Sequence, residues 1–135
     1  MQNAIRQPAD EGLRVYLVED SEIVRSRLES LLGAIPGVRT VGHAAGALDA
    51  IRGIHAEQPD LVLLDLRLAQ GSGFDVLSAT RDLAPAPEIY VLSSFVDGPY
   101  RTLALSLGAT DCFDKINDFE RVRDLVAERA AHITH

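Results

Sequence analysis

Four short stretches of the chain hold side chains that could perform chemistry together. Two adjacent carboxylates, Glu19 and Asp20, follow one apolar run, and a third carboxylate, Asp65, follows another. Ser93 and Lys115 add a hydroxyl and an ammonium group at the ends of two later runs. Lys115 is the only lysine among thirteen basic residues. A lone lysine in such a chain indicates a site that needs a compact and rotatable charge.

Three carboxylates brought within a few Å of one another require compensation. At a separation of about 4 Å, each pair repels by ~4 kcal/mol at an effective dielectric constant of about 20. Such a group therefore takes up either a proton or a divalent cation. Oxygen ligands without His or Cys favour Mg²⁺, for which Mn²⁺ or Ca²⁺ could substitute. A carboxylate beside such a cation, faced by a hydroxyl and an ammonium group, is arranged for phosphoryl transfer onto its own oxygen.

The elements that must position these residues alternate along the chain. Apolar runs predict strands over 13–18, 38–43, 61–64, 88–92 and 111–114. Helical periodicity predicts helices over 22–35, 47–56, 74–83, 99–107 and 118–133, with Ile23 and Leu48 among the buried positions. This alternation predicts an α/β fold, a parallel sheet with helices on both faces. The carboxyl ends of its strands meet at one edge, where ligands bind in such sheets.

Composition limits the functions that the chain can have. Its 135 residues, 47% hydrophobic and 24% charged, predict one globular domain over 13–133, preceded by a flexible leader over 1–12 and without an output domain. The net charge of −7 argues against direct nucleic-acid binding. No apolar run is long enough for a membrane span, and no signal peptide is recognisable, so a cytoplasmic location is expected.

Four segments together resemble the receiver domain of two-component response regulators. They are 17–21, 63–68 with Gly73, 91–94 and 113–115, and the resemblance extends over about 13–131. It implies a single flavodoxin-like (βα)5 domain of three layers, with strand order 2-1-3-4-5. The residues at 66–68 and 71–73 are similar to those of the LuxR/NarL-like subfamily.

The resemblance also implies a role for Asp65 and for its neighbours. Asp65 would accept a phosphoryl group from a sensor histidine kinase or a histidine phosphotransfer protein. Asp20, Asp65 and the backbone carbonyl of Arg67 would ligate Mg²⁺, and Glu19 would act through water. The domain would be regulatory rather than an enzyme in its own right.

Further positions would bind the phosphoryl group or transmit the signal. Ser93 would take the switch hydroxyl role and Lys115 the phosphate-binding role. Arg67 and Phe95 fall where family members tune the lifetime of the phosphoryl group. Cys112 stands where the family usually has an aromatic switch residue, so switching should rest more on Ser93 and on backbone shifts after it.

The face formed by the fourth helix, fifth strand and fifth helix would mediate dimerisation or target binding, with Leu105 and Ile116 as candidate apolar contacts. Ala69 and Ile116 stand where receivers usually have prolines.

Several alternatives compete with a phosphoacceptor acting by protein contact. The chain could be the receiver part of a longer LuxR-type DNA-binding regulator, or a degenerate receiver that serves as a binding module. A flavodoxin-like cofactor binder is disfavoured because Glu19 and Asp20 would repel a cofactor phosphate. A haloacid-dehalogenase-like phosphatase needs a second aspartate two residues after the nucleophile, where this chain has Arg67.

Overall fold

The protein, seen in a computed structural model, is described over residues 12–94 and 97–133. These residues confirm the predicted alternation of strands and helices. The strands are β1 (Leu13–Val18), β2 (Val38–Ala44), β3 (Leu61–Leu64), β4 (Glu88–Ser93) and β5 (Asp111–Asp114). The helices are α1 (Glu22–Gly33), α2 (Ala47–Glu57), α3 (Gly73–Thr80), α4 (Pro99–Ser106) and α5 (Phe119–Ile133).

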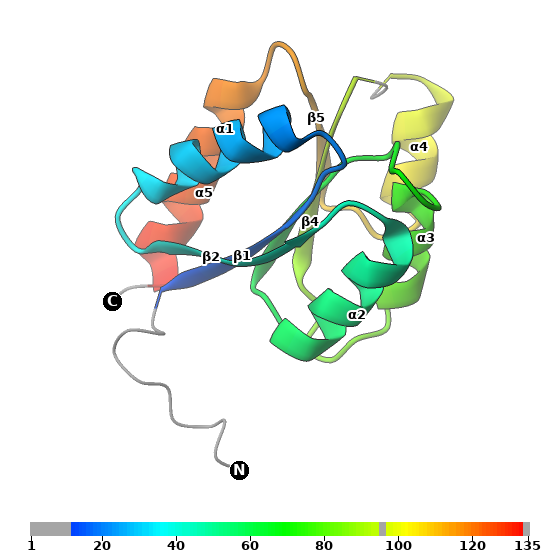
Figure 1. Ribbon diagram of the computed structural model, residues 1–135, viewed down its shortest axis with the longest axis horizontal. Coiled ribbons are helices and arrows are strands. Elements are labelled where there is room, and N and C mark those ends of the chain that lie inside the picture. The colour runs from blue at the N-terminus through cyan, green and yellow to red at the C-terminus, as the bar shows by residue number, and fades with distance from the viewer. Residues whose placement is uncertain (1–11, 95–96, 134–135) are drawn as a thin grey trace.

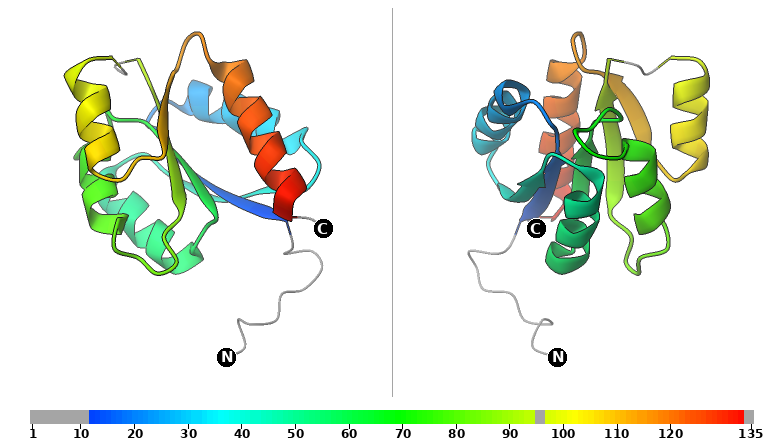
Figure 2. Two further views of the ribbon diagram at one scale, coloured as in Figure 1. Left: turned by 180° about the vertical axis from the view of Figure 1, so that it is seen from behind. Right: turned by 45° about the vertical axis from the view of Figure 1, so that its right-hand side comes forward.

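The strands form one parallel sheet in the order β2-β1-β3-β4-β5. This is the order that the resemblance implied. Helices α1 and α5 cover one face, and α2, α3 and α4 cover the other, which gives three layers (Figures 1 and 2). The site predicted from the sequence therefore has one edge on which to assemble.

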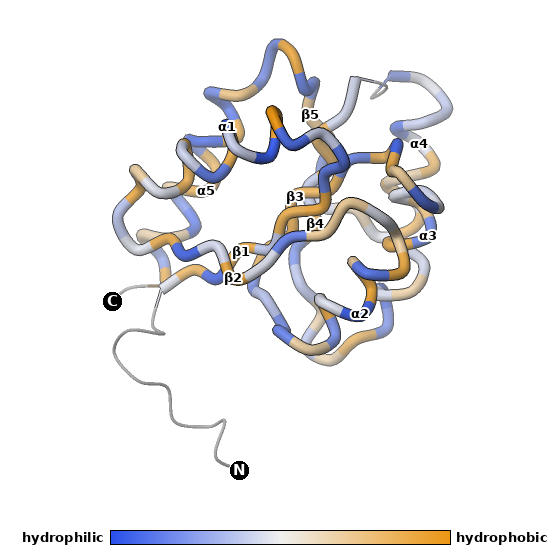
Figure 3. Tube along the Cα trace, in the orientation of Figure 1, coloured by the Kyte–Doolittle hydropathy of each residue, from blue (hydrophilic) through white to orange (hydrophobic). Residues whose placement is uncertain are grey.

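Strand β3 shows why the centre of the sheet is apolar. Its four residues are all buried, because helices pack on both of its faces. Leu61 and Leu63 join the core beneath α1 and α5, whereas Val62 and Leu64 join the core on the opposite face. The apolar colouring of the central strands follows from this double coverage (Figure 3).

Two residues predicted to face the core are exposed instead. Ile23 is 77% exposed and Leu48 is 50% exposed. In α1 the buried residues are Leu28 and Leu32, and the position one turn before Leu28 on that face is 24 rather than 23. In α2 the buried residues are Ala47, Ala50 and Ile54, so the buried face begins one residue before Leu48. Because successive helical residues differ by about 100°, a shift of one position turns a side chain away from the sheet.

Helix boundaries also differ from the predictions. Helix α1 ends at Gly33 rather than at 35, and α3 covers Gly73–Thr80 rather than 74–83. Leu83 N–H donates to Thr80 O in a turn that follows α3, so the apolar Leu83 packs on the core without being helical.

The predicted leader over 1–12 lies, except for Gly12, outside the described residues. Within those residues, no helix is long and apolar enough to cross a bilayer.

Candidate functional site at the carboxyl edge of the sheet

The strands bring Glu19, Asp65 and Lys115 together at the carboxyl edge of the sheet. Glu19 N–H donates to Ala44 O at 3.0 Å, and Asp65 N–H donates to Val18 O at 3.0 Å. Lys115 N–H continues the β4–β5 pairing by donating to Ser93 O at 3.1 Å. Backbone hydrogen bonds thus fix the Cα position of each residue independently of its side-chain contacts.

Glu19, Asp20 and Asp65 form a group that we name the acidic cluster. One carboxylate oxygen from each lies within 4.8 Å of the other two. Glu19 and Asp65 are buried, with 4% and 5% exposure, whereas Asp20 is exposed. An adjoining cleft of about 460 Å³ is lined in part by Glu19, Asp20 and Glu22. An all-oxygen group that is open to solvent on one side fits a hard divalent cation that keeps some of its water.

Lys115 supplies the positive charge that faces the acidic cluster. Its Nζ lies 2.7 Å from Asp65 Oδ2 and 3.1 Å from Glu19 Oε1. Burial lowers the pKa of Lys115, but the contacts with Asp65 and Glu19 outweigh burial, and the net pKa is raised. Lys115 is therefore an ammonium ion at neutral pH and binds both buried carboxylates at once.

The carboxyl group of Glu19 has a raised pKa. Burial is the largest cause, and repulsion from Asp65 adds to it. The backbone N–H of Ser21, which donates to Glu19 Oε2 at 3.0 Å, and Lys115 both lower the pKa, yet the net shift is upward. One ammonium group therefore leaves this cluster of three carboxylates short of positive charge.

The loop after β3 is shaped to fit closely around Asp65. Arg67 N–H donates to Asp65 Oδ1 at 3.4 Å, and the Arg67 side chain is exposed. A Cβ atom at Gly73 would collide with the carbonyl oxygen of Asp65. Glycine at this position allows the start of α3 to pack against the backbone of Asp65.

The remaining predicted site residues lie around this centre. Ser93 is fully buried at the end of β4. Cys112 is buried in β5, and burial raises the pKa of its thiol. Phe95 lies outside the described residues. The apolar residues Leu105 and Ile116 are exposed, by 39% and 76%.

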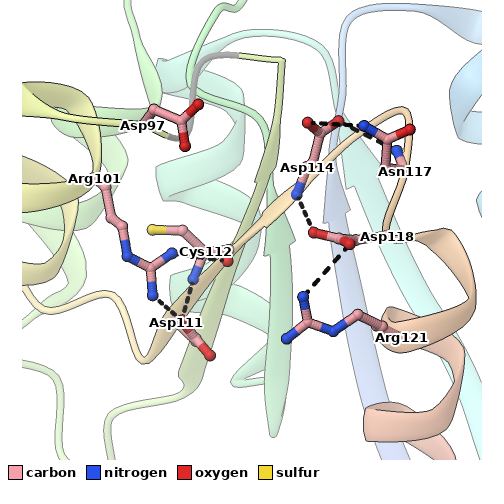
Figure 4. Close-up of a pocket in the computed structure, with 8 residues that line it drawn as sticks. All are labelled: Asp97, Arg101, Asp111, Cys112, Asp114, Asn117, Asp118 and Arg121. Atoms are coloured by element: carbon pink, nitrogen blue, oxygen red, sulfur yellow. Dashed lines mark hydrogen bonds and ion pairs between the residues drawn. The ribbon is translucent and has the colours of Figure 1, made fainter.

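A second cleft, of about 350 Å³, lies between α4 and α5 over β5 (Figure 4). Arg101 of α4 donates to Asp111 Oδ1 at 2.8 Å and to Cys112 O at 3.1 Å. Asp114 and Asp118 line the opposite side. Neither aspartate was predicted to have a role of its own, because the hydrogen bonds of a loop depend on its backbone path and not on sequence periodicity.

Comparison with known proteins identifies relatives of the chain. Residues 15–127 match the family described as response regulator receiver domain. A protein-glutamate methylesterase/protein-glutamine glutaminase of Caulobacter vibrioides is 34% identical over 122 residues, which cover 90% of this chain and 36% of that protein. The corresponding protein of Rhizobium etli is 37% identical over 103 residues, covering 76% and 30%. The chain thus spans about a third of the length of these curated relatives.

Solved structures show the same arrangement of strands and helices. The response regulator domain of Thermotoga maritima CheB superposes with a TM-score of 0.79 at 24% identity, covering 90% of this chain and 96% of that one. The signal receiver domain of a NarL response regulator from Mycobacterium tuberculosis gives a TM-score of 0.76 at 27% identity, covering 90% and 95%.

Proposed function

The chain belongs to the response regulator receiver domain family, and from that premise we propose that Asp65 accepts a phosphoryl group from a phosphohistidine. The donor would be a sensor histidine kinase or a histidine phosphotransfer protein. One observation carries the proposal: Asp65 is buried inside the acidic cluster with its Oδ2 2.7 Å from the only lysine of the chain. This combination supplies a nucleophile and a cation for the phosphoryl oxygens.

The transfer uses the carboxylate of Asp65 directly. One Asp65 oxygen forms a bond to phosphorus while the phosphorus–nitrogen bond of the phosphohistidine breaks, and the imidazole leaves with the electron pair of that bond. Lys115 moves from the carboxylate to the transferred phosphoryl oxygens, because their charge exceeds that of the original carboxylate. Ser93 donates its hydroxyl to one of these oxygens in the phosphorylated state.

The acidic cluster fits a magnesium ion, since its ligands are all oxygens and its charge exceeds that of Lys115. Asp20 and Asp65 would hold the ion together with the backbone carbonyl of Arg67, and Glu19 would bind it through water. Mn²⁺ or Ca²⁺ could substitute. When bound, the ion neutralises charge on the phosphoryl oxygens.

Phosphorylation would change the surface by drawing Ser93 toward the phosphoryl group on Asp65, while Lys115 shifts from the carboxylate to the phosphoryl oxygens. Cys112 lacks a ring, so backbone shifts after β4 would carry the signal to α4. Arg67 and Phe95 would set how long the phosphoryl group persists.

The face of α4, β5 and α5 would then bind a second copy or a target protein. The match to methylesterases favours, as the second candidate, a receiver that regulates an attached catalytic domain. We place this signalling in the cytoplasm.

Intact-mass measurement after incubation with acetyl phosphate and Mg²⁺ tests the proposal. The wild-type protein should gain one phosphoryl group, and Asp65→Asn should gain none because the amide is not a nucleophile. Asp111→Asn is the matched control, since Asp111 lies outside the acidic cluster and its variant should be labelled like wild type. Labelling that persists in Asp65→Asn would mean that another residue is the acceptor.

A further inference from the structure

We infer that Asp114 is a positioning residue whose carboxylate holds Lys115 against Asp65. The inference rests on the proposed function, because the placement of Lys115 matters for chemistry only if Asp65 accepts a phosphoryl group. The Asp114 carboxylate accepts backbone N–H groups of the loop after Lys115, so it would act through the backbone of the neighbouring residues.

The position of the Lys115 Nζ atom depends on how the backbone of Lys115 is held. Its side chain has four rotatable carbon–carbon bonds, and its Nζ must stay within hydrogen-bond distance of both Asp65 and Glu19. Lys115 N–H donates to Ser93 O, and the chain then leaves the sheet and reaches α5 at Phe119. What fixes Lys115 on its C-terminal side is therefore the loop over 115–118.

The carboxylate of Asp114 closes this loop around Lys115. Asp114 Oδ1 accepts from Ile116 N–H at 2.7 Å and from Asn117 N–H at 3.2 Å. Asp114 Oδ2 accepts from Asn117 Nδ2 at 3.4 Å, as the close-up shows (Figure 4). An aspartate that binds the backbone two residues later forms an Asx turn, which here encloses Lys115.

A reciprocal pair of hydrogen bonds fastens the far end of the loop. Asp114 N–H donates to Asp118 Oδ2 at 2.8 Å, and Asp118 N–H donates to Asp114 O at 3.0 Å. Packing adds little, because the Ile116 side chain is 76% exposed. No proline restricts the backbone after Lys115, where Ile116 stands. The hydrogen bonds of Asp114 are therefore what gives this loop its shape.

The reactivity of the single lysine toward a succinimidyl ester tests the inference independently of phosphorylation. Peptide mass mapping separates acylation of Lys115 from that of the N-terminal amine. In Asp114→Ala, Lys115 should be acylated about fivefold faster than in the wild-type protein, because the loss of hydrogen bonds of ordinary strength frees its amine for part of the time. Asp114→Asn should react like wild type, since its amide oxygen accepts from the same two N–H groups.

Asp111→Ala is the matched control for this measurement. It removes a carboxylate from the same strand, but from the end remote from Lys115, and it should acylate at the wild-type rate. Should Asp114→Ala fail to fold in urea titration, Asp114→Glu replaces it: the charge stays, the acceptor moves by one methylene, and acylation should again be faster.

The rate of Asp65 phosphorylation by acetyl phosphate is the second readout. Misplacing Lys115 should slow it about tenfold in Asp114→Ala, with recovery in Asp114→Asn. The inference would be overturned if Lys115 were acylated at the wild-type rate in both Asp114→Ala and Asp114→Glu. It would also be overturned if Lys115 of Asp114→Asn were acylated faster than in the wild-type protein. If acylation follows the expected order while the wild-type protein accepts no phosphoryl group, the positioning role stands and the proposed function fails.

Discussion

Two groups of three carboxylates among the described residues differ in what their oxygens contact. The acidic cluster consists of Glu19, Asp20 and Asp65. The second group, which we name the β5 carboxylates, consists of Asp111, Asp114 and Asp118. In the acidic cluster, Glu19 and Asp65 share one ammonium group, and their carboxylates lie within 4.8 Å of Asp20. Each of the β5 carboxylates accepts a backbone N–H at 2.7–2.8 Å, whereas the backbone N–H groups that donate to Glu19 and Asp65 do so at 3.0 and 3.4 Å.

The difference shows how the same side chain serves structure or chemistry. A carboxylate that accepts backbone N–H groups at short range is satisfied, and it fixes the turn or strand end that holds it. Carboxylates that crowd together with too few donors keep an unmet demand for positive charge. Such crowding costs stability, and it is the arrangement that the proposed cation and phosphoryl transfer would use.

The largest expected effect is that of removing the shared ammonium group. Lys115→Met keeps the apolar stem but leaves Glu19 and Asp65 buried without their cation, which should cost about 3 kcal/mol of unfolding free energy without metal. Millimolar Mg²⁺ should restore part of this loss, because it would bind the same oxygens. Urea unfolding with and without Mg²⁺ measures both effects. An unchanged midpoint would show that the two carboxylates do not depend on Lys115.

A smaller effect of opposite sign is expected when one crowded carboxylate is neutralised. The pKa of Glu19 is raised from its ordinary value of 4.5, so the folded state binds more protons than the unfolded state as pH rises above that value. The contribution of Glu19 is therefore most favourable below pH 4.5 and is lost as pH rises through the folded-state pKa.

Glu19→Gln should remove this loss and raise the unfolding free energy by about 1 kcal/mol at neutral pH without Mg²⁺. The gain should shrink toward pH 4.5. Urea titrations at a series of pH values provide the measurement. A Glu19→Gln protein that is less stable than wild type at neutral pH would contradict the crowding of the acidic cluster.

The smallest effect is expected on the side of the β5 carboxylates. Arg101→Met removes a cation from Asp111, but both side chains are more than 40% exposed, and Asp111 keeps its bond from Cys112 N–H. The cost should be about 0.5 kcal/mol and should decrease further in high salt. Arg101→Met and Lys115→Met both replace a basic residue by methionine. A similar loss of unfolding free energy in the two variants would remove the distinction between the two groups of carboxylates.

Much of the candidate site could be predicted because parallel strands end at the same edge. That rule brings Asp65 and Lys115 together from positions 50 residues apart, and the structure places them in contact. Sequence could not tell which of the adjacent carboxylates Glu19 and Asp20 is buried, since the turn after β1 decides their orientation. It also could not indicate the bonds of Asp114, because these depend on the backbone path of the loop rather than on periodicity.

The exposed positions of Ile23 and Leu48 were mispredicted for a related reason. Both lie in the first turn of a helix, where the direction of approach to the sheet decides which residue faces inward. Apolar character alone does not report that direction. The length and end of α3 were also set by packing, since Leu83 reaches the core from a turn.

The bonds along β5 also decide how a neighbouring molecule can approach this side of the protein. β5 is an edge strand, yet Cys112 N–H, Cys112 C=O and Asp114 N–H are already bound to side chains of Asp111, Arg101 and Asp118. An extended peptide that tried to lengthen the sheet would have to displace those side chains first. These bonds disfavour aggregation by addition of a strand to β5. A partner on this side must therefore be recognised through side chains.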